Sequence, residues 1–137
     1  TAGLFFLPNR TTINAKKYVD LLKDKLELHM NIHKCKIFMQ DGTSYHKSKI
    51  VSEFLKEKIK VLDWPCNSPD LNPIENVWEV LKNKVADKQP SSAKDLEDAI
   101  KEVWICELSP AYCRTLVESM PRRLEMVIKN NGGHTKY

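Results

Sequence analysis

The chain has 137 residues, of which 42% are hydrophobic and 29% are charged, and its formal net charge is +4. We expect one folded domain rather than a disordered chain, because this length and apolar content suffice for an ordinary core. No run approaches the roughly 20 apolar residues of a membrane helix, and residues 1–12 lack the layout of a secretory signal, so we expect neither. The chain opens on Thr1 rather than Met, so we expect it to be a piece of a longer protein or a trimmed form of one.

The first half of the chain is predicted to alternate strands with helices. Short apolar runs that end at Pro8, at the Asp41-Gly42 turn and at Pro65 indicate strands, and apolar residues at helical spacing indicate helices between them. In chain order these elements are a strand at 3–8, a helix at 16–30, a strand at 35–40, a helix at 48–58 and a strand at 59–64. The helices are expected to bury Tyr18, Leu22 and Leu26, and then Ile50, Val51, Phe54 and Leu55.

The second half is predicted to be helical. A loop with three prolines follows Trp64, and a helix begins at Pro73 and ends before Pro90. Two more helices are expected at 92–107 and 110–129, and Pro121 should break or kink the second one. The inward residues of the first two helices are expected to be Val77, Trp78, Leu81, Val85, Leu96, Ile100, Val103 and Trp104. Two asparagines and two glycines at 130–133 end the regular structure, so we expect a flexible tail at 130–137.

The order of these elements indicates an α/β fold with crossover connections between its strands. Three strands make a thin sheet, yet a run such as GLFFLP is apolar on both faces, as a covered central strand requires. We therefore expect part of the sheet to be missing from this sequence.

Two acids are candidates for a metal site. Asp41 follows the predicted strand 35–40, at the end of the strand where open α/β sheets bind ligands, and Glu75 lies in the first turn of a later helix. Both could bind Mg²⁺, because this hard ion takes oxygen ligands. A purely structural interpretation fits the same residues: Asp41 begins an ordinary turn, and Asn72, Pro73 and Glu75 have the layout of a helix capping box.

The segment from Gln40 to Lys82 carries three informative strings, QDG, HKSK and VLDWPCNSPDLNPIENVWEVLK. They resemble the catalytic core of transposases of the mariner superfamily, in its Tc-type branch. The resemblance implies a ribonuclease-H-like fold that holds a triad of two aspartates and one glutamate, known as the DDE triad. Asp41 matches its second acid and Glu75 its third, and the intervening segment is shorter than is usual in the family.

The first acid of that triad has no counterpart here, since no acid precedes Asp20, which lies in the first predicted helix. We therefore expect a catalytic domain that is truncated at its N-terminal strands and that keeps its C-terminal helices. With one carboxylate missing, this chain alone is expected to be inactive. The alternative is an inactive remnant that serves only as a nucleic-acid-binding or protein-interaction module.

The resemblance also implies the reaction and its setting. Transposases of this family cut transposon ends with Mg²⁺, for which Mn²⁺ can substitute, and join the freed DNA end to target DNA. The implied partners are therefore transposon-end DNA and target DNA, with a homodimer as a further possibility for the intact protein. The implied location is the nucleus, and no membrane is involved.

Several other residues are candidates for minor roles. His46 falls where such transposases often have a histidine after the second acid, although a solvated loop histidine fits equally well. Contacts to DNA phosphates could come from Lys82, Lys84, Lys88, Arg122 and Arg123, for which a solvated basic face is the alternative. The four cysteines have no paired spacing and are expected to be reduced.

Overall fold

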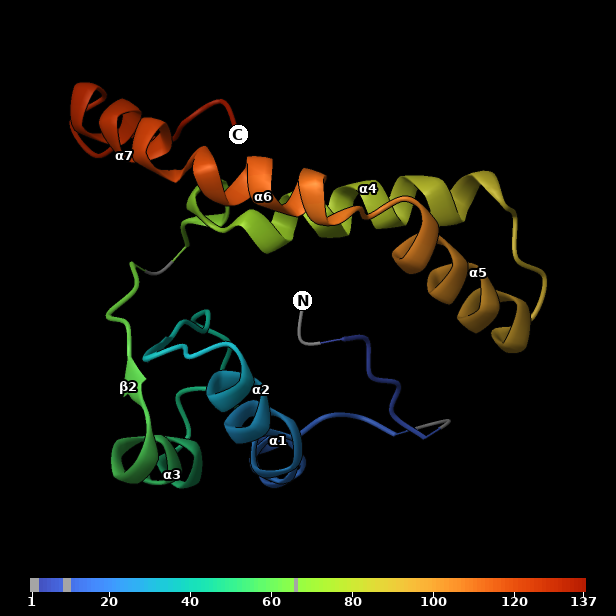
Figure 1. The fold of residues 1–137 in the computed structure, drawn as a ribbon, viewed down its shortest axis with the longest axis horizontal. Coiled ribbons are helices and arrows are strands. Elements are labelled where there is room, and N and C mark those ends of the chain that lie inside the picture. Colours follow the sequence, from blue (N-terminus) through green and yellow to red (C-terminus); the bar gives the residue numbers. More distant parts are fainter. Residues whose placement is uncertain (1–2, 9–10, 66) are drawn as a thin grey trace. The chain divides into compact units, whose positions relative to one another are not determined.

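The computed structural model describes residues 3–8, 11–65 and 67–137, and it divides into two compact units, Thr1–Asn67 and Ser68–Tyr137 (Figure 1). The elements of the N-terminal unit are α1 (Ala15–Leu21), η1 (Leu22–Leu26), α2 (Glu27–Ile32), β1 (Ile37–Phe38), α3 (Lys49–Lys58) and β2 (Lys60–Val61). Those of the C-terminal unit are η2 (Pro69–Leu71), α4 (Pro73–Asp87), α5 (Ala93–Cys106), α6 (Pro110–Glu118) and α7 (Met120–Lys129).

The helix predicted at 16–30 is one continuous helical run made of α1, the π-helical segment η1 and α2. It begins at Asn14, whose side chain accepts a hydrogen bond of 3.0 Å from the backbone N–H of Lys17. This N-terminal cap satisfies a donor that the helix cannot pair internally. The prediction is confirmed, with small extensions at both ends.

Strands β1 and β2 pair in parallel, with Ile37 opposite Lys60 and Phe38 opposite Val61. Helix α3 forms the crossover between them, as the α/β prediction requires. Both strands are shorter than predicted. One face of α3 packs on α1, and the buried cluster of this unit is Tyr18, Val19, Leu22, Val51, Phe54 and Leu55.

Two details of the N-terminal prediction are wrong. Residues 3–8 form no strand, and Phe5, Phe6 and Leu7 are each about 40% exposed (44%, 39% and 43%). A strand needs a hydrogen-bonded neighbour, and the described part of the chain offers only the β1–β2 pair, which 3–8 does not join. Ile50 is also exposed, because it lies at the edge of the apolar stripe of α3.

The C-terminal unit is built on α4 and α5, which pack against each other. Its buried cluster is Val77, Leu81, Val85, Ala99, Val103 and Leu108, with Trp78 and Trp104 packed against it. Leu96, predicted to point inward, is exposed, since it lies one turn ahead of Ala99 at the end of α5 that the core does not cover. Ser92 and Ser109 cap α5 and α6 through hydrogen bonds from the backbone N–H groups of Asp95 and Tyr112.

The predicted helix at 110–129 is broken into α6 and α7 at Ser119, two residues before Pro121. Pro121 stands in the first turn of α7, where its missing N–H costs nothing. Residues 130–137, predicted to be a flexible tail, have no regular structure but contact the loop before α4 and α7. Cys35, Cys106 and Cys113 are free thiols, and Cys66 lies outside the described residues.

No helix within residues 3–8, 11–65 and 67–137 is both long enough and apolar enough to cross a membrane.

Candidate active site

Asp41 lies in the loop that follows β1, three residues beyond the carboxyl end of the strand. Its Oδ1 accepts a hydrogen bond of 2.9 Å from the backbone N–H of Thr43 and lies 2.6 Å from His46 Nδ1. The first contact is the local turn that the structural interpretation predicts. The carboxylate is nevertheless 47% exposed, so it can reach a ligand while it holds the turn.

Two opposing effects act on the pKa of Asp41. Partial burial raises the pKa, but the hydrogen bonds from Thr43 and the contact with His46 together outweigh it, so the pKa lies below its usual range. The side chain is therefore a carboxylate at neutral pH, which is the form that binds a cation.

His46 is held by two aromatic rings that the sequence did not point to as part of a site. Its ring lies 4.3 Å from that of Tyr18 and 4.5 Å from that of Tyr45, and its side chain is only 12% exposed. The Tyr18 hydroxyl donates to Gln40 Oε1 at 3.2 Å, and Gln40 Nε2 donates to the His46 carbonyl at 3.4 Å. The interpretation of His46 as a solvated loop histidine is wrong, because it is packed beside the acid.

Burial, with smaller contributions from Tyr45 and Asp41, raises the pKa of the Tyr18 phenol. Tyr18 consequently stays a neutral hydrogen-bond donor at physiological pH. The sequence could place Tyr18 only on a buried helix face, and it could not show which loop the ring would meet.

Glu75 is the third residue of α4, after Pro73 at the first helical position, and its side chain is exposed. Its backbone N–H donates to the Asn72 carbonyl at 3.0 Å. The capping box is not formed, because the buried Asn72 side chain makes no capping hydrogen bond. Glu75 lines a cavity of about 310 Å³ together with Pro69, Asp70, Asn76, Glu79, His134, Thr135 and Tyr137.

Asp41 belongs to the N-terminal unit and Glu75 to the C-terminal unit. In the described part of the chain, no three His, Cys, Asp or Glu side chains are grouped so that they could hold a metal ion. The donor chemistry at both positions does fit a hard divalent cation, since each is an exposed carboxylate and the one at Asp41 is held in its charged form.

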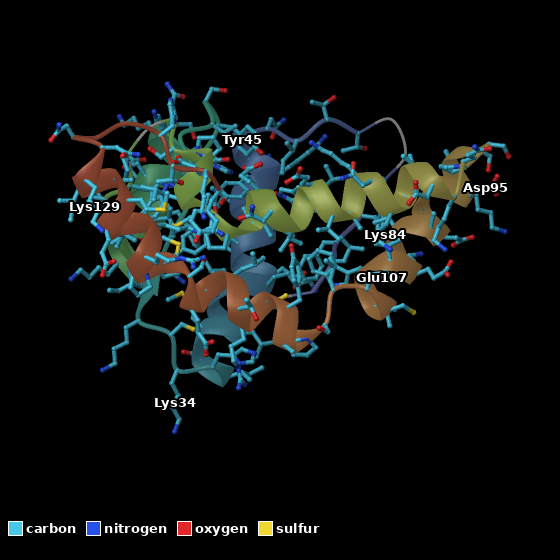
Figure 2. All side chains as sticks on the ribbon, turned by 90° about the horizontal axis from the view of Figure 1, so that it is seen from above. Lys34, Tyr45, Lys84, Asp95, Glu107 and Lys129 are labelled. Atoms are coloured by element: carbon cyan, nitrogen blue, oxygen red, sulfur yellow. The ribbon has the colours of Figure 1, made fainter. Side chains whose placement is uncertain are left out.

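The basic residues predicted to contact DNA are placed unequally. Lys84 and Lys88 form ion pairs with Glu107 at 3.6 Å and Glu102 at 2.8 Å, and Lys84 and Glu107 are labelled in Figure 2. Lys82 and Arg122 are exposed.

The prediction for Arg123 is wrong. This side chain is 1% exposed, and its nitrogens donate to protein oxygens.

The sequence reasoning also missed where the positive charge gathers. Residues 1–67 contain twelve Lys and Arg against seven Asp and Glu, whereas residues 68–137 contain ten against eleven. In the N-terminal unit, Lys36, Lys58 and Lys60 line a cavity of about 490 Å³ at the amino ends of the strands, where Glu27 pairs with Lys58 at 2.6 Å. A separate count of the net charge of each half of the sequence could have revealed this concentration of positive charge in residues 1–67.

Residues 1–97 match the family model described as DDE superfamily endonuclease. The chain belongs to this family. It is 34% identical over 123 residues to the Tcb2 transposable element transposase of Caenorhabditis briggsae, an alignment that covers 88% of this chain and 45% of the relative. It is 37% identical over 108 residues to the Tc1 transposase of Caenorhabditis elegans, covering 78% and 39%. The chain thus spans less than half the length of these relatives.

The crystal structure of the catalytic domain of Mos1 mariner transposase has a similar fold. The match has a TM-score of 0.80 at 20% sequence identity and covers 93% of this chain and 66% of that one. The family and the relationship to Tc1/mariner transposases confirm the resemblance expected from the segment between Gln40 and Lys82.

Proposed function

We propose that this chain is the C-terminal part of a ribonuclease-H-like transposase catalytic domain that takes part in DNA strand cleavage and strand transfer. The observation that carries the proposal is Asp41, an exposed carboxylate after a parallel strand, supported by a partly buried histidine, in a chain that shares its fold with the Mos1 catalytic domain. Family membership and the identity to Tc1-type transposases support it further.

In this proposal, Asp41 and Glu75 hold Mg²⁺ or Mn²⁺. Structures of the Mos1 catalytic domain have been determined with Mn and with Mg. When bound, such ions activate an attacking oxygen and stabilise a leaving one during phosphoryl transfer. His46 acts on Asp41 rather than on DNA: the contact of Nδ1 with Oδ1 fixes the direction in which the carboxylate points. A third carboxylate, from the first acid of the triad, completes the set.

The proposed partner is DNA, both transposon ends and target. The Mos1 transposase has been solved as a strand transfer complex and as a paired-end complex with the left transposon end. For this chain, the excess positive charge of the N-terminal unit supports contact with phosphates, and Lys82 and Arg122 remain candidates in the C-terminal unit. We place the intact protein in the nucleus, where its substrate lies, and propose that it acts as a homodimer on paired ends.

The test is metal-dependent nicking of transposon-end DNA by a complete catalytic domain that contains this chain. Asp41→Asn and Glu75→Gln should each reduce nicking below detection in Mg²⁺, because each removes a charged ligand. The matched controls, Asp63→Asn and Asp87→Asn, change exposed acids outside the site and should leave the rate unchanged. Nicking that survives Glu75→Gln would refute the proposal.

A second candidate function is DNA binding without catalysis, favoured by the concentration of positive charge in residues 1–67. It predicts salt-sensitive, sequence-tolerant DNA binding that Asp41→Asn does not alter, together with no Mg²⁺-dependent nicking by the complete domain. Binding that requires both Mg²⁺ and Asp41 would favour the catalytic proposal instead.

A further inference from the structure

Arg123 of α7 is a buried charge whose hydrogen bonds connect three segments. Its Nη1 donates to the Asp70 carbonyl at 2.6 Å, its Nη2 to Asn76 Oδ1 at 2.8 Å and its Nε to Ser119 Oγ at 2.8 Å. A buried guanidinium is tolerated only when its donors are satisfied, so these contacts have to form together. They attach α7 to the loop before α4 and to the first turn of α4.

The C-terminal segment 134–137 completes this arrangement. The backbone N–H of Thr135 donates to Asp70 Oδ2 at 2.7 Å, so Asp70 is held at its carbonyl by Arg123 and at its carboxylate by the tail. The centre of the Tyr137 ring lies 4.3 Å from the Arg123 guanidinium carbon, within cation–π range. The Tyr137 hydroxyl is buried and has no hydrogen-bond partner among the described residues, so Tyr137 stabilises the Arg123 guanidinium through its ring.

These contacts fix the backbone on both sides of Glu75. Asp70 lies five residues before it and Asn76 directly after it, and both are tied to Arg123. The backbone N–H groups of Leu71, Asn72 and Glu75 bond to carbonyls within the same stretch. The tail also forms one wall of the cavity that Glu75 lines.

We propose that Asp70, Arg123 and residues 134–137 form a clamp that holds in place the backbone that carries the Glu75 carboxylate. Asp70, Arg123 and Tyr137 are positioning residues: they act through the loop and helix start that carry Glu75. Only the effect of the clamp on metal binding rests on the proposed function. The contacts that form the clamp do not depend on that function.

The first experiment tests the clamp without reference to activity. Amide hydrogen exchange is measured on the 137-residue chain carrying Tyr137→Ala or the matched Tyr137→Phe, which keeps the ring and removes only the unpartnered hydroxyl. Tyr137→Ala should speed exchange at Leu71, Asn72 and Glu75 by about tenfold, the factor expected when a cation–π contact to a buried guanidinium is lost, while Val103 in α5 is unchanged. Exchange at these amides that is equal in both variants would overturn the clamp.

The second experiment measures the Mg²⁺ concentration for half-maximal nicking by the complete catalytic domain. Tyr137→Ala should raise it by about tenfold or more, whereas Tyr137→Phe should not. If Glu75→Gln abolishes nicking but both Tyr137 variants behave alike, the clamp is wrong and the proposed function stands. If Glu75→Gln leaves nicking intact, both the proposed function and the role of the clamp in it are wrong.

Discussion

Asp70 and Arg123 are charged side chains that lie inside the C-terminal unit, with 7% and 1% of their surface exposed. Each has its own set of hydrogen bonds, and the Asp70 carbonyl joins the two. The hydrogen bond from Thr135 lowers the pKa of Asp70, and this effect exceeds the opposing effect of burial. The charged form of Asp70 is thus the one that the folded state favours.

A pH dependence of stability follows. Because the folded pKa of Asp70 lies below its ordinary value of 3.8, the stability it contributes is fully present above that value and is lost as the pH falls through the folded pKa. Asp70→Asn should therefore flatten the fall in the free energy of unfolding between pH 6 and pH 3. The measurement is urea unfolding in a Trp64→Phe background, so that fluorescence reports on Trp78 and Trp104 of the C-terminal unit. An equally steep fall in both proteins would contradict the prediction.

Sequence reasoning pointed to Asp41 and Glu75 because their signals are local: one follows an apolar run, and the other lies in the distinctive nine-residue string SPDLNPIEN. It misassigned Arg123 as a DNA contact because two adjacent arginines, Arg122 and Arg123, are typical of an exposed basic surface. What decides its burial is Asp70, 53 residues earlier in the chain. No local pattern carries information about a partner at that distance.

At the scale of elements, the helices were predictable because each has its own apolar periodicity. Their boundaries were predictable from residues that start or break helices, such as Ser92, Ser109 and Pro121. The structure of segment 3–8 was not predictable in this way. A strand forms only beside a neighbour that pairs with it, and an apolar run does not indicate whether such a neighbour is present. The same reason explains why β1 and β2 are shorter than their apolar runs.

Helices α4 and α5 provide the core on which the start of α4, and hence Glu75, is supported. Leu81→Ala should lower the free energy of unfolding by about 2–5 kcal/mol, because it leaves a cavity between two packed helices. Ile105 in α5 is 77% exposed, so Ile105→Ala should change the free energy of unfolding by less than about 0.5 kcal/mol. Urea unfolding followed by circular dichroism measures both, and equal losses would show that the two helices do not pack as described.

At the scale of the whole molecule, the net charge of +4 conceals an uneven division. Residues 1–67 carry a net charge of +5 and residues 68–137 a net charge of −1. Both units neutralise part of their lysine charge internally, through pairs such as Lys58 with Glu27 and Lys88 with Glu102. Electrostatic attraction to a polyanion should therefore come mainly from the N-terminal unit.

This division predicts how DNA affinity depends on salt. The double variant Lys36→Gln, Lys60→Gln should reduce the slope of log affinity against log salt by about 2, since about one counterion is released per phosphate contact. The double variant Lys84→Gln, Lys88→Gln should change it less, because those lysines are paired with glutamates. Fluorescence anisotropy across a salt series gives both slopes. A larger change in the second variant would place the DNA contacts on α4 instead.

The hydrogen bond between Thr135 and Asp70 spans 65 residues, and this has a consequence for synthesis on the ribosome. The loop before Glu75 is translated first, and at about 5–20 residues per second its partner follows roughly 3–13 s later. For most of that interval Asp70 lacks Arg123 as well as the tail, so the loop cannot yet take its final form. A message cut short after α7 would yield every helix of this unit, including Arg123, but would leave Asp70 and the Arg123 guanidinium without their contacts to the tail.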